Sequence, residues 1–223
     1  MTGTAVTMAA AKLRDELLRV AAQLLQTSAE RLSVAGDRVV VSEAPDGPSL
    51  DLAAIARAAG GEMTADATFT MQQMTYPYGV HVAQVRVDRA ICGVTVERFF
   101  VGYDIGRAVN PMLVEGQIGG GAAQGIGATL LEEFVYDPSG EPLSVTFADY
   151  LMPTIAEIPA IEVALFEDAP TPLNPLGVKG AGEAGINAVG AAIAAAIDDA
   201  LGKPGLVRQL PITPARLHAL LTS

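Results

Sequence analysis

The spacing of apolar residues changes along the chain at about residue 62. Before this point apolar side chains recur every three or four residues, as they do on one face of a helix. The elements expected here are a helix at 6–26, a helical turn at 28–32, a strand at 38–41, a polar loop at 43–47 and a helix at 50–59 that Ser49 caps.

After residue 62 apolar and polar residues alternate, which is the period of a strand. Two of these runs are separated by a turn at 89–93 and predict a hairpin, although the alternation shifts phase once between Val82 and Val85. The expected strands are 64–71, 79–88, 94–101, 143–150 and 161–166, and the expected helices are 112–133, 186–201 and a short one that begins at Thr213–Pro214.

These two patterns predict an α+β chain with mixed sheets and packed helices. We expect two parts, with a boundary where the period changes. Residues 1–66 would form a helical segment with a small strand, and residues 67–223 would form the α+β domain.

Composition narrows the range of partners. Half of the residues are hydrophobic and only 17% are charged, so we expect either a large subunit interface or a tightly packed core. The formal net charge of -11 disfavours binding to nucleic acid or to an anionic membrane, because both would repel the protein.

Few residues in this sequence suit metal binding. Cys92 is the single cysteine, which excludes an internal disulfide, a cysteine-based zinc site and an iron–sulfur cluster within the chain. The only histidines are His81 and His218, and His81 lies between valines in an expected strand, where a structural role is common. We expect no signal peptide and no membrane span, and therefore a cytoplasmic protein.

The expected helix at 112–133 is unusually rich in glycine. Six of the twelve residues from Gly116 to Gly127 are glycine, and each weakens a helix by roughly 0.5–1 kcal/mol relative to alanine. Such a pattern predicts close approach of another backbone or of a flat ligand. Gln117 and Gln124 would then either face solvent or an interface, or bind a heterocycle through their amides.

A second glycine-rich stretch, Asn174–Gly185, contains one carboxylate, Glu183. If the next helix begins at Ile186, this acid lies at a helix N-terminus, where it either caps the helix or takes part in proton transfer. Residues 180–185 also match G-x-G-x-x-G, but prolines separate them from the preceding strand, so a Rossmann-type nucleotide site is disfavoured.

Several motifs occur in an order that resembles the C-terminal part of the molybdopterin-binding large subunit of the molybdenum hydroxylases, the family of xanthine dehydrogenase, aldehyde oxidase and aerobic carbon monoxide dehydrogenase. The matching motifs are Tyr78-Gly79, Asp104-Ile105-Gly106, Asn110-Pro111, Glu115-Gly116-Gln117, Gln124-Gly125-Ile126-Gly127, Asp149-Tyr150, Pro153-Thr154, Asn174 to Gly180, and Gly182-Glu183. The resemblance covers nearly the whole chain.

This resemblance implies a role for each matching residue. Glu183 corresponds to the family's active-site glutamate, the general base, and Gln117 to the glutamine that hydrogen-bonds the pterin. Lys179, Gly180, Ala181 and Gly182 correspond to backbone close to the cofactor. The implied cofactor is molybdopterin with molybdenum, in the cytosine dinucleotide form usual in bacteria. The pterin holds the metal, so no protein metal ligand is expected.

The resemblance also implies partners. The family's large subunit is several times longer, so we expect another chain to supply the missing N-terminal molybdopterin-binding portion and the substrate pocket. Iron–sulfur and FAD subunits would carry electrons away from a small substrate such as an aldehyde or N-heterocycle. Gly119 departs from the family pattern, where many members have histidine. The alternatives are a non-catalytic interaction or assembly module and, less favoured, a Rossmann-like nucleotide binder.

Overall fold

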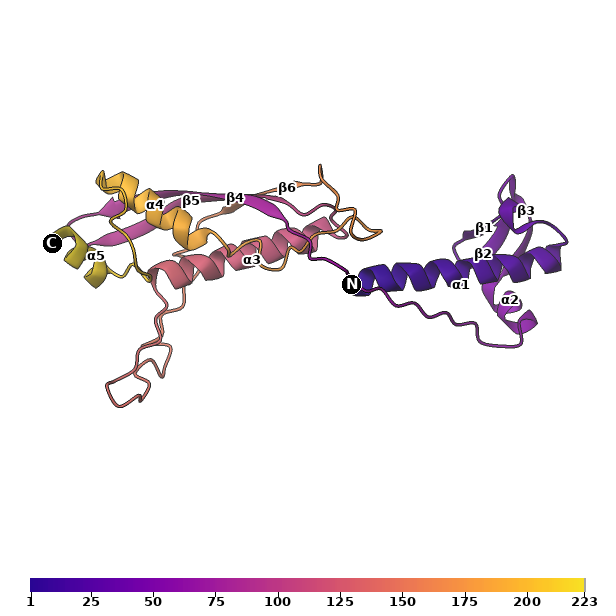
Figure 1. The fold of residues 1–223 in the computed structure, drawn as a ribbon, viewed down its shortest axis with the longest axis horizontal. Coiled ribbons are helices and arrows are strands. Elements are labelled where there is room, and N and C mark those ends of the chain that lie inside the picture. Colours follow the sequence, from indigo (N-terminus) through magenta and orange to yellow (C-terminus); the bar gives the residue numbers. More distant parts are fainter. Residues whose placement is uncertain (223) are drawn as a thin grey trace. The chain divides into compact units, whose positions relative to one another are not determined.

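The computed structural model describes residues 1–222 and contains both helices and sheets, which confirms the expected α+β class. The chain divides into two compact units, one formed by Met1–Gln72 and the other by the residues from Gln73 onward. Each unit has its own three-stranded sheet and its own hydrophobic core (Figure 1). No helix within residues 1–222 has the length and apolar character needed to cross a membrane.

The first unit packs a long helix against a small antiparallel sheet. Its core joins Val20 and Ala21 of the helix to Leu32, Val39 and Ile55. The sheet has the strand order β1–β2–β3. In chain order the elements are α1 (Thr2–Leu25), a 3-10 turn η1 (Ala29–Arg31), β1 (Leu32–Ala35), β2 (Arg38–Val41), β3 (Ala44–Asp51) and α2 (Leu52–Ala58).

Two expectations for this unit are wrong. The segment 43–47 is not a free loop, because β3 begins at Ala44 and pairs with β2 through an irregular register at Val41. The cap of α2 is Asp51 and not Ser49: the Asp51 carboxylate accepts a hydrogen bond from Ala54 N at 2.6 Å. Strand pairing extends through Ser49 and delays the start of the helix by two residues.

The second unit builds a mixed sheet that two helices cover. β4 (Tyr78–Asp88) and β5 (Gly93–Asp104) form the expected antiparallel hairpin, and β6 (Ile161–Phe166) lies parallel to β5. α3 (Pro111–Leu130) and α4 (Val189–Leu201) pack against each other and the sheet, with α4 along β4 (Figure 1). The chain ends in α5 (Pro214–Thr222), and the core includes Phe99, Val101, Ile118, Ile126 and Ile193.

The hairpin contains a β-bulge, but this bulge lies in β5 and not at the β4 valines where the apolar pattern shifts phase. Gln84 pairs with Arg98 and Val85 pairs with Val96, so the extra residue, Glu97, lies in β5. Within β4 the alternation is unbroken, and it turns His81 inward while Val80 and Val82 are 55% and 54% exposed. The valines of β4 therefore do not all share one face.

Two other expected strands do not form. Residues 64–71 alternate in burial but have no sheet partner among the described residues, and residues 143–150 contain only turns and bends. The second segment belongs to a long excursion between α3 and β6 that leaves the body of this unit (Figure 1). An alternating sequence becomes a strand only where another strand can accept its hydrogen bonds.

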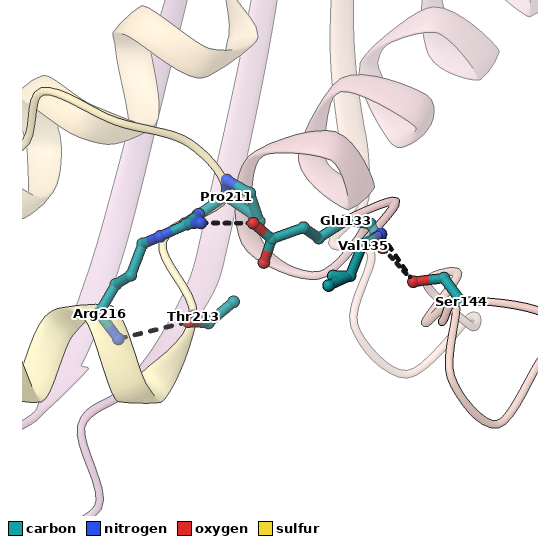
Figure 2. Close-up of polar contacts among 6 residues, drawn as sticks. All are labelled: Glu133, Val135, Ser144, Pro211, Thr213 and Arg216. Carbon is teal, nitrogen blue, oxygen red and sulfur yellow. Dashed lines mark hydrogen bonds and ion pairs between the residues drawn. The ribbon is translucent and has the colours of Figure 1, made fainter. Parts of the chain in front are cut away.

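A polar cluster fixes the start of this excursion to the C-terminal segment. The Arg216 guanidinium pairs with the Glu133 carboxylate and donates to Pro211 O (Figure 2). Ser144 closes the base of the excursion, because its hydroxyl donates to Glu133 O and accepts from Val135 N. Glu133, the residue at which we expected α3 to end, lies three residues beyond the helix and serves this junction instead.

Candidate functional site

The segment between β6 and α4 is held at its start by Asn174. This buried side chain accepts from Val178 N at 3.1 Å and donates to Val178 O at 2.9 Å, so it closes the turn over Pro175–Gly177. Gly177 adopts φ +69°, a conformation that favours glycine. The segment therefore leaves this turn in a fixed direction.

Lys179 anchors the segment to the end of β5. Its backbone N donates to Ile105 O at 2.8 Å, and its ammonium lies 3.0 Å from Asp104 Oδ2. Burial of the Asp104 carboxyl opposes its ionisation, but the hydrogen bond from Gly106 N and the Lys179 charge together lower the pKa of Asp104. The Lys179 charge is thus neutralised within the fold, and what this residue offers a ligand is backbone.

Residues 180–183 follow with backbone that is open to a ligand. Within residues 1–222 their four amide groups donate no hydrogen bond, whereas Lys179 N and Ala184 N both do. A Cβ placed on Gly180 or Gly182 would meet no atom within 4 Å. The predicted residues Gly180, Ala181 and Gly182 therefore present free backbone donors with little side-chain cover.

Glu183 does not lie at a helix start, contrary to our expectation. It belongs to a run of turns over 182–188, and α4 begins only at Val189. Its carbonyl accepts from Ile186 N and Asn187 N, while the side chain is exposed and pairs with no other group among the described residues. The reading as a helix cap is therefore wrong for this carboxylate.

Gln117 comes from α3 and meets this segment, 65 residues further along the chain. Its Nε2 donates to Gly182 O at 2.8 Å. In residues 1–222 its side-chain oxygen accepts no hydrogen bond, so an acceptor remains beside Gly182. Asn110 caps this helix through its side chain, which accepts from Leu113 N at 3.2 Å, and Pro111 lies in the first turn.

The glycines of α3 serve two purposes. Gly121 and Gly125 allow contact between elements: a Cβ on Gly125 would lie 2.6 Å from Val189 Cγ2, and one on Gly121 would lie 3.1 Å from Gly185 Cα. Gly116 and Gly120 flank Gln117 along the helix and have no atom within 4 Å of a Cβ position. We call Gly116, Gly120, Gly180 and Gly182 the open glycine surface.

His81 reaches the same segment from β4. Its Nε2 lies 3.0 Å from the carbonyl oxygen of Ala184, the residue after Glu183. Burial lowers the pKa of His81, although the bond to Ala184 opposes this effect. The sequence marked this histidine only as a structural residue, and no local signal links it to a position 103 residues away.

No group of three or more His, Cys, Asp or Glu side chains in residues 1–222 is arranged to hold a metal ion. The G-x-G-x-x-G run also lacks the strand–turn–helix setting of a nucleotide fingerprint, since β6 ends at Phe166 and α4 begins at Val189. The features at this site are a free carboxylate, an amide, unpaired backbone donors and the open glycine surface.

Comparison with known proteins shows the family to which this chain belongs. Residues 1–159 match the model of the molybdopterin cofactor-binding domain. The chain belongs to this family. Its match to the family extends over most of the sequence and includes Gln117, which lies beside the open glycine surface.

Several relatives of this chain are named as molybdenum-binding or large subunits of enzymes. It is 38% identical to the 6-hydroxypseudooxynicotine dehydrogenase complex subunit gamma of Paenarthrobacter nicotinovorans, over 98% of this chain and 29% of that subunit. It is 34% identical to the putative xanthine dehydrogenase molybdenum-binding subunit XdhA of Escherichia coli K12, over 96% of this chain and 29% of that subunit.

A solved structure supports the same relationship. Quinoline 2-oxidoreductase from Pseudomonas putida 86 matches with a TM-score of 0.83 and 35% identity, over 96% of this chain and 28% of that one. The chain thus spans less than a third of the length of the relatives it matches. It is homologous to one region of the large subunits of molybdenum-dependent hydroxylases and dehydrogenases.

The residues present fit a molybdopterin. Molybdopterin contains a flat pterin heterocycle, with hydrogen-bond donors and acceptors on its edges, and a side chain that ends in a phosphate. The open glycine surface leaves room that a Cβ at any of its four positions would reduce. The side-chain oxygen of Gln117 and the amides of residues 180–183 supply an acceptor and donors next to that room.

Proposed function

We propose that the chain forms part of the catalytic subunit of a molybdenum hydroxylase and supplies the general base and one wall of the molybdopterin site. The observation that carries this proposal is the geometry around Glu183. An exposed, unpaired carboxylate sits on backbone that side chains hold from both sides, next to the open glycine surface. Glu183 differs from solvated acids such as Asp168 in its place on this fixed segment beside the open glycine surface.

We assign cofactor binding to Gln117 and to Lys179, Gly180, Ala181 and Gly182. Gln117 would hold the pterin through its side-chain oxygen, and the amides of residues 180–182 would hold anionic or carbonyl groups. Lys179 would act through its anchored backbone, since its ammonium pairs with Asp104. The cofactor would be the cytosine dinucleotide form, and when bound it supplies a molybdenum centre that accepts electrons from the substrate.

Glu183 would remove a proton during hydroxylation. Replacing a C–H bond by a C–OH group with oxygen from water releases two protons and two electrons. One proton would pass to the Glu183 carboxylate. This carboxylate can accept it because its side chain is exposed and pairs with no cation among the described residues. The bound cofactor would supply the acceptor for the two electrons, and no residue of this chain needs to carry them.

The substrate pocket and the electron carriers would lie outside these residues. We propose that the rest of the molybdopterin site comes from further large-subunit sequence, in the same polypeptide or another one, and that iron–sulfur and FAD subunits accept the electrons. The name of one relative as a subunit of a dehydrogenase complex supports such an assembly. The substrate would be a small aldehyde, N-heterocycle or similar molecule.

The decisive test replaces Glu183 by glutamine in the enzyme assembled with the remaining large-subunit sequence and its partners. Turnover of benzaldehyde, quinoline or xanthine with an artificial electron acceptor should fall by about 100-fold or more, because a general base typically contributes 10²–10⁴-fold. Molybdenum and pterin content should not change. Glu141→Gln, at an exposed acid in the excursion, is the matched control and should leave the rate unaltered.

Near-normal turnover in Glu183→Gln would exclude the catalytic role. Full assembly of the native protein with molybdopterin but no turnover of any tested substrate would favour the alternative, a non-catalytic module that keeps the cofactor-binding fold.

A further inference from the structure

His81 makes a hydrogen bond that is unusual for a histidine in a strand. Its ring lies edge-on to Phe99 and Tyr103, with centroids 5.8 and 6.5 Å away, and Nε2 contacts Ala184 O at 3.0 Å. A carbonyl oxygen can only accept a hydrogen bond, so Nε2 must carry the proton. The contact therefore assigns the Nε2–H tautomer to a neutral ring.

The other ring nitrogen has no partner. His81 Nδ1 is buried and, within residues 1–222, forms no hydrogen bond. A buried polar atom without a partner is unfavourable and calls for a reason. A phenylalanine would fill the same space without that penalty, so packing alone does not account for a histidine here. What the histidine adds is the Nε2–H group on Ala184 O.

The Ala184 bond is one of two that flank Glu183. Gln117 of α3 holds Gly182 O from one side, and His81 of β4 holds Ala184 O from the other. Gly185 closes the arrangement, since a Cβ there would lie 2.0 Å from Ile118 O. The peptide groups around Glu183 are thus fixed to two separate elements, although the segment contains glycines that would otherwise leave it flexible.

We propose that His81 is a positioning residue: by holding the Ala184 carbonyl it directs the Glu183 carboxylate toward the reacting atoms. The role rests on the proposed function of Glu183. Proton transfer needs a base within hydrogen-bond reach of its target, and a displacement of about 1 Å can lower a rate by about 100-fold. His81 itself touches neither substrate nor cofactor in this role.

The tautomer can be observed directly in the 223-residue chain. A long-range ¹H–¹⁵N spectrum at pH 7 should show His81 with a protonated Nε2 and an unprotonated Nδ1. The chain has two histidines, so a His218→Gln variant leaves one imidazole and makes the assignment unambiguous. An Nδ1–H tautomer at pH 7, which leaves Nε2 without a proton to donate to Ala184 O, would overturn the proposal without any variant of His81.

Three substitutions of His81 then separate the effect of its hydrogen bond to Ala184 O from the effect of its packing. In His81→Gln the amide nitrogen can occupy the place of Nε2 and donate to Ala184 O, whereas His81→Asn is too short and His81→Leu has no donor. Hydrogen exchange of the bonded amides of Ala184, Ile186 and Asn187 should rise at least tenfold in the Leu and Asn variants and return toward the native rate in the Gln variant. The β4–β5 hairpin should stay protected in all three.

In the assembled enzyme, kcat for the Leu and Asn variants should fall by about 10- to 100-fold with KM and molybdenum content unchanged, and the Gln variant should recover most of the rate. Equal exchange rates and equal kcat in all variants would contradict the positioning role. Failure of the proposed function has a different signature, because Glu183→Gln would then keep its activity while the exchange pattern of the His81 variants persists.

Discussion

Lys179 brings a positive charge into the interior, and Asp104 neutralises it there. The Lys179 and Asp104 side chains are only 7% and 20% exposed, and the ammonium also lies 5.5 Å from the centre of the Tyr78 ring. Pairs that are shielded from water are worth more than exposed ones, and breaking one leaves a buried charge alone. This pair fixes the start of the segment that ends at Glu183.

Asp104→Asn should lower the free energy of unfolding by about 2 kcal/mol at pH 7. The pKa of Asp104 is lower in the folded protein than in the unfolded chain, so its contribution is complete above the unfolded pKa, about 4. The contribution disappears as the pH falls through the lower, folded-state pKa. Urea unfolding at pH 7, 5 and 3 should therefore show a gap between native protein and variant that narrows only at the lowest pH.

Asp168→Asn provides the control, because Asp168 is exposed and forms no ion pair within residues 1–222. It should match the native protein at every pH. A gap between Asp104→Asn and the native protein that stays constant from pH 7 to pH 3 would show that charge pairing is not what stabilises this contact.

At the scale of elements, α3 shows why a helix tolerates six glycines. On one side of the helix, Gly121 and Gly125 allow close contact with Gly185 and Val189. On the side beside Gln117, a Cβ at the glycine positions would meet no other atom within 4 Å. Close packing at Gly121 and Gly125 stabilises this chain by itself. The open glycines beside Gln117 weaken the helix, and their presence is explained if a ligand covers that surface.

Alanine at two positions of α3 separates these uses. Gly125→Ala should lower the free energy of unfolding by about 1–3 kcal/mol, because its Cβ would lie 2.6 Å from a Val189 methyl group in a packed interior. Gly120→Ala should raise it by about 0.5–1 kcal/mol through helix propensity alone, since its Cβ meets no atom within 4 Å. Thermal or urea unfolding followed by circular dichroism measures both.

In the assembled enzyme we expect the stabilising variant to bind less cofactor. Gly120→Ala adds a methyl group to the open glycine surface, so this variant should contain less molybdopterin than the native enzyme. Full cofactor content in Gly120→Ala would exclude Gly120 from the cofactor wall that we propose.

At the scale of the whole molecule, two units with separate cores are joined by a segment without helix or strand, from Gly60 to Pro77. Its first part is tied to α1, since Lys12 donates to Asp66 O at 3.0 Å and Met63 packs against the core of the first unit. Gln72, Gln73 and Met74 are exposed and belong to no helix or strand.

Brief digestion with subtilisin should therefore cut the native chain first near Gln72 to Met74 and leave two resistant fragments, identified by mass spectrometry. Trypsin should not cut there, because no lysine or arginine occurs between Arg57 and Arg86. Initial cleavage inside α3 or the β4–β5 hairpin would contradict the division into two stable units.

The sequence by itself determined the features that depend on neighbours along the chain. The long first helix, the hairpin and the start of α3 at Asn110–Pro111 follow from periodicity, turn residues and capping, which act over a few residues. The order of motifs also indicated the family before any geometry was known. Gln117 and residues 179–183 were found in this way, and their roles stay predictions.

Only the tertiary structure decided which segments pair. Residues 64–71 and 143–150 alternate as strands do, but no strand in residues 1–222 accepts their hydrogen bonds. The bonds that flank Glu183 join positions 65 and 103 residues apart, and Lys179 pairs with Asp104 across 75. Such contacts depend on how distant elements pack, and the local sequence pattern does not encode this packing. Glu183 was expected at a helix start, but the tertiary structure makes it an unpaired carboxylate on a backbone segment that other elements hold in place.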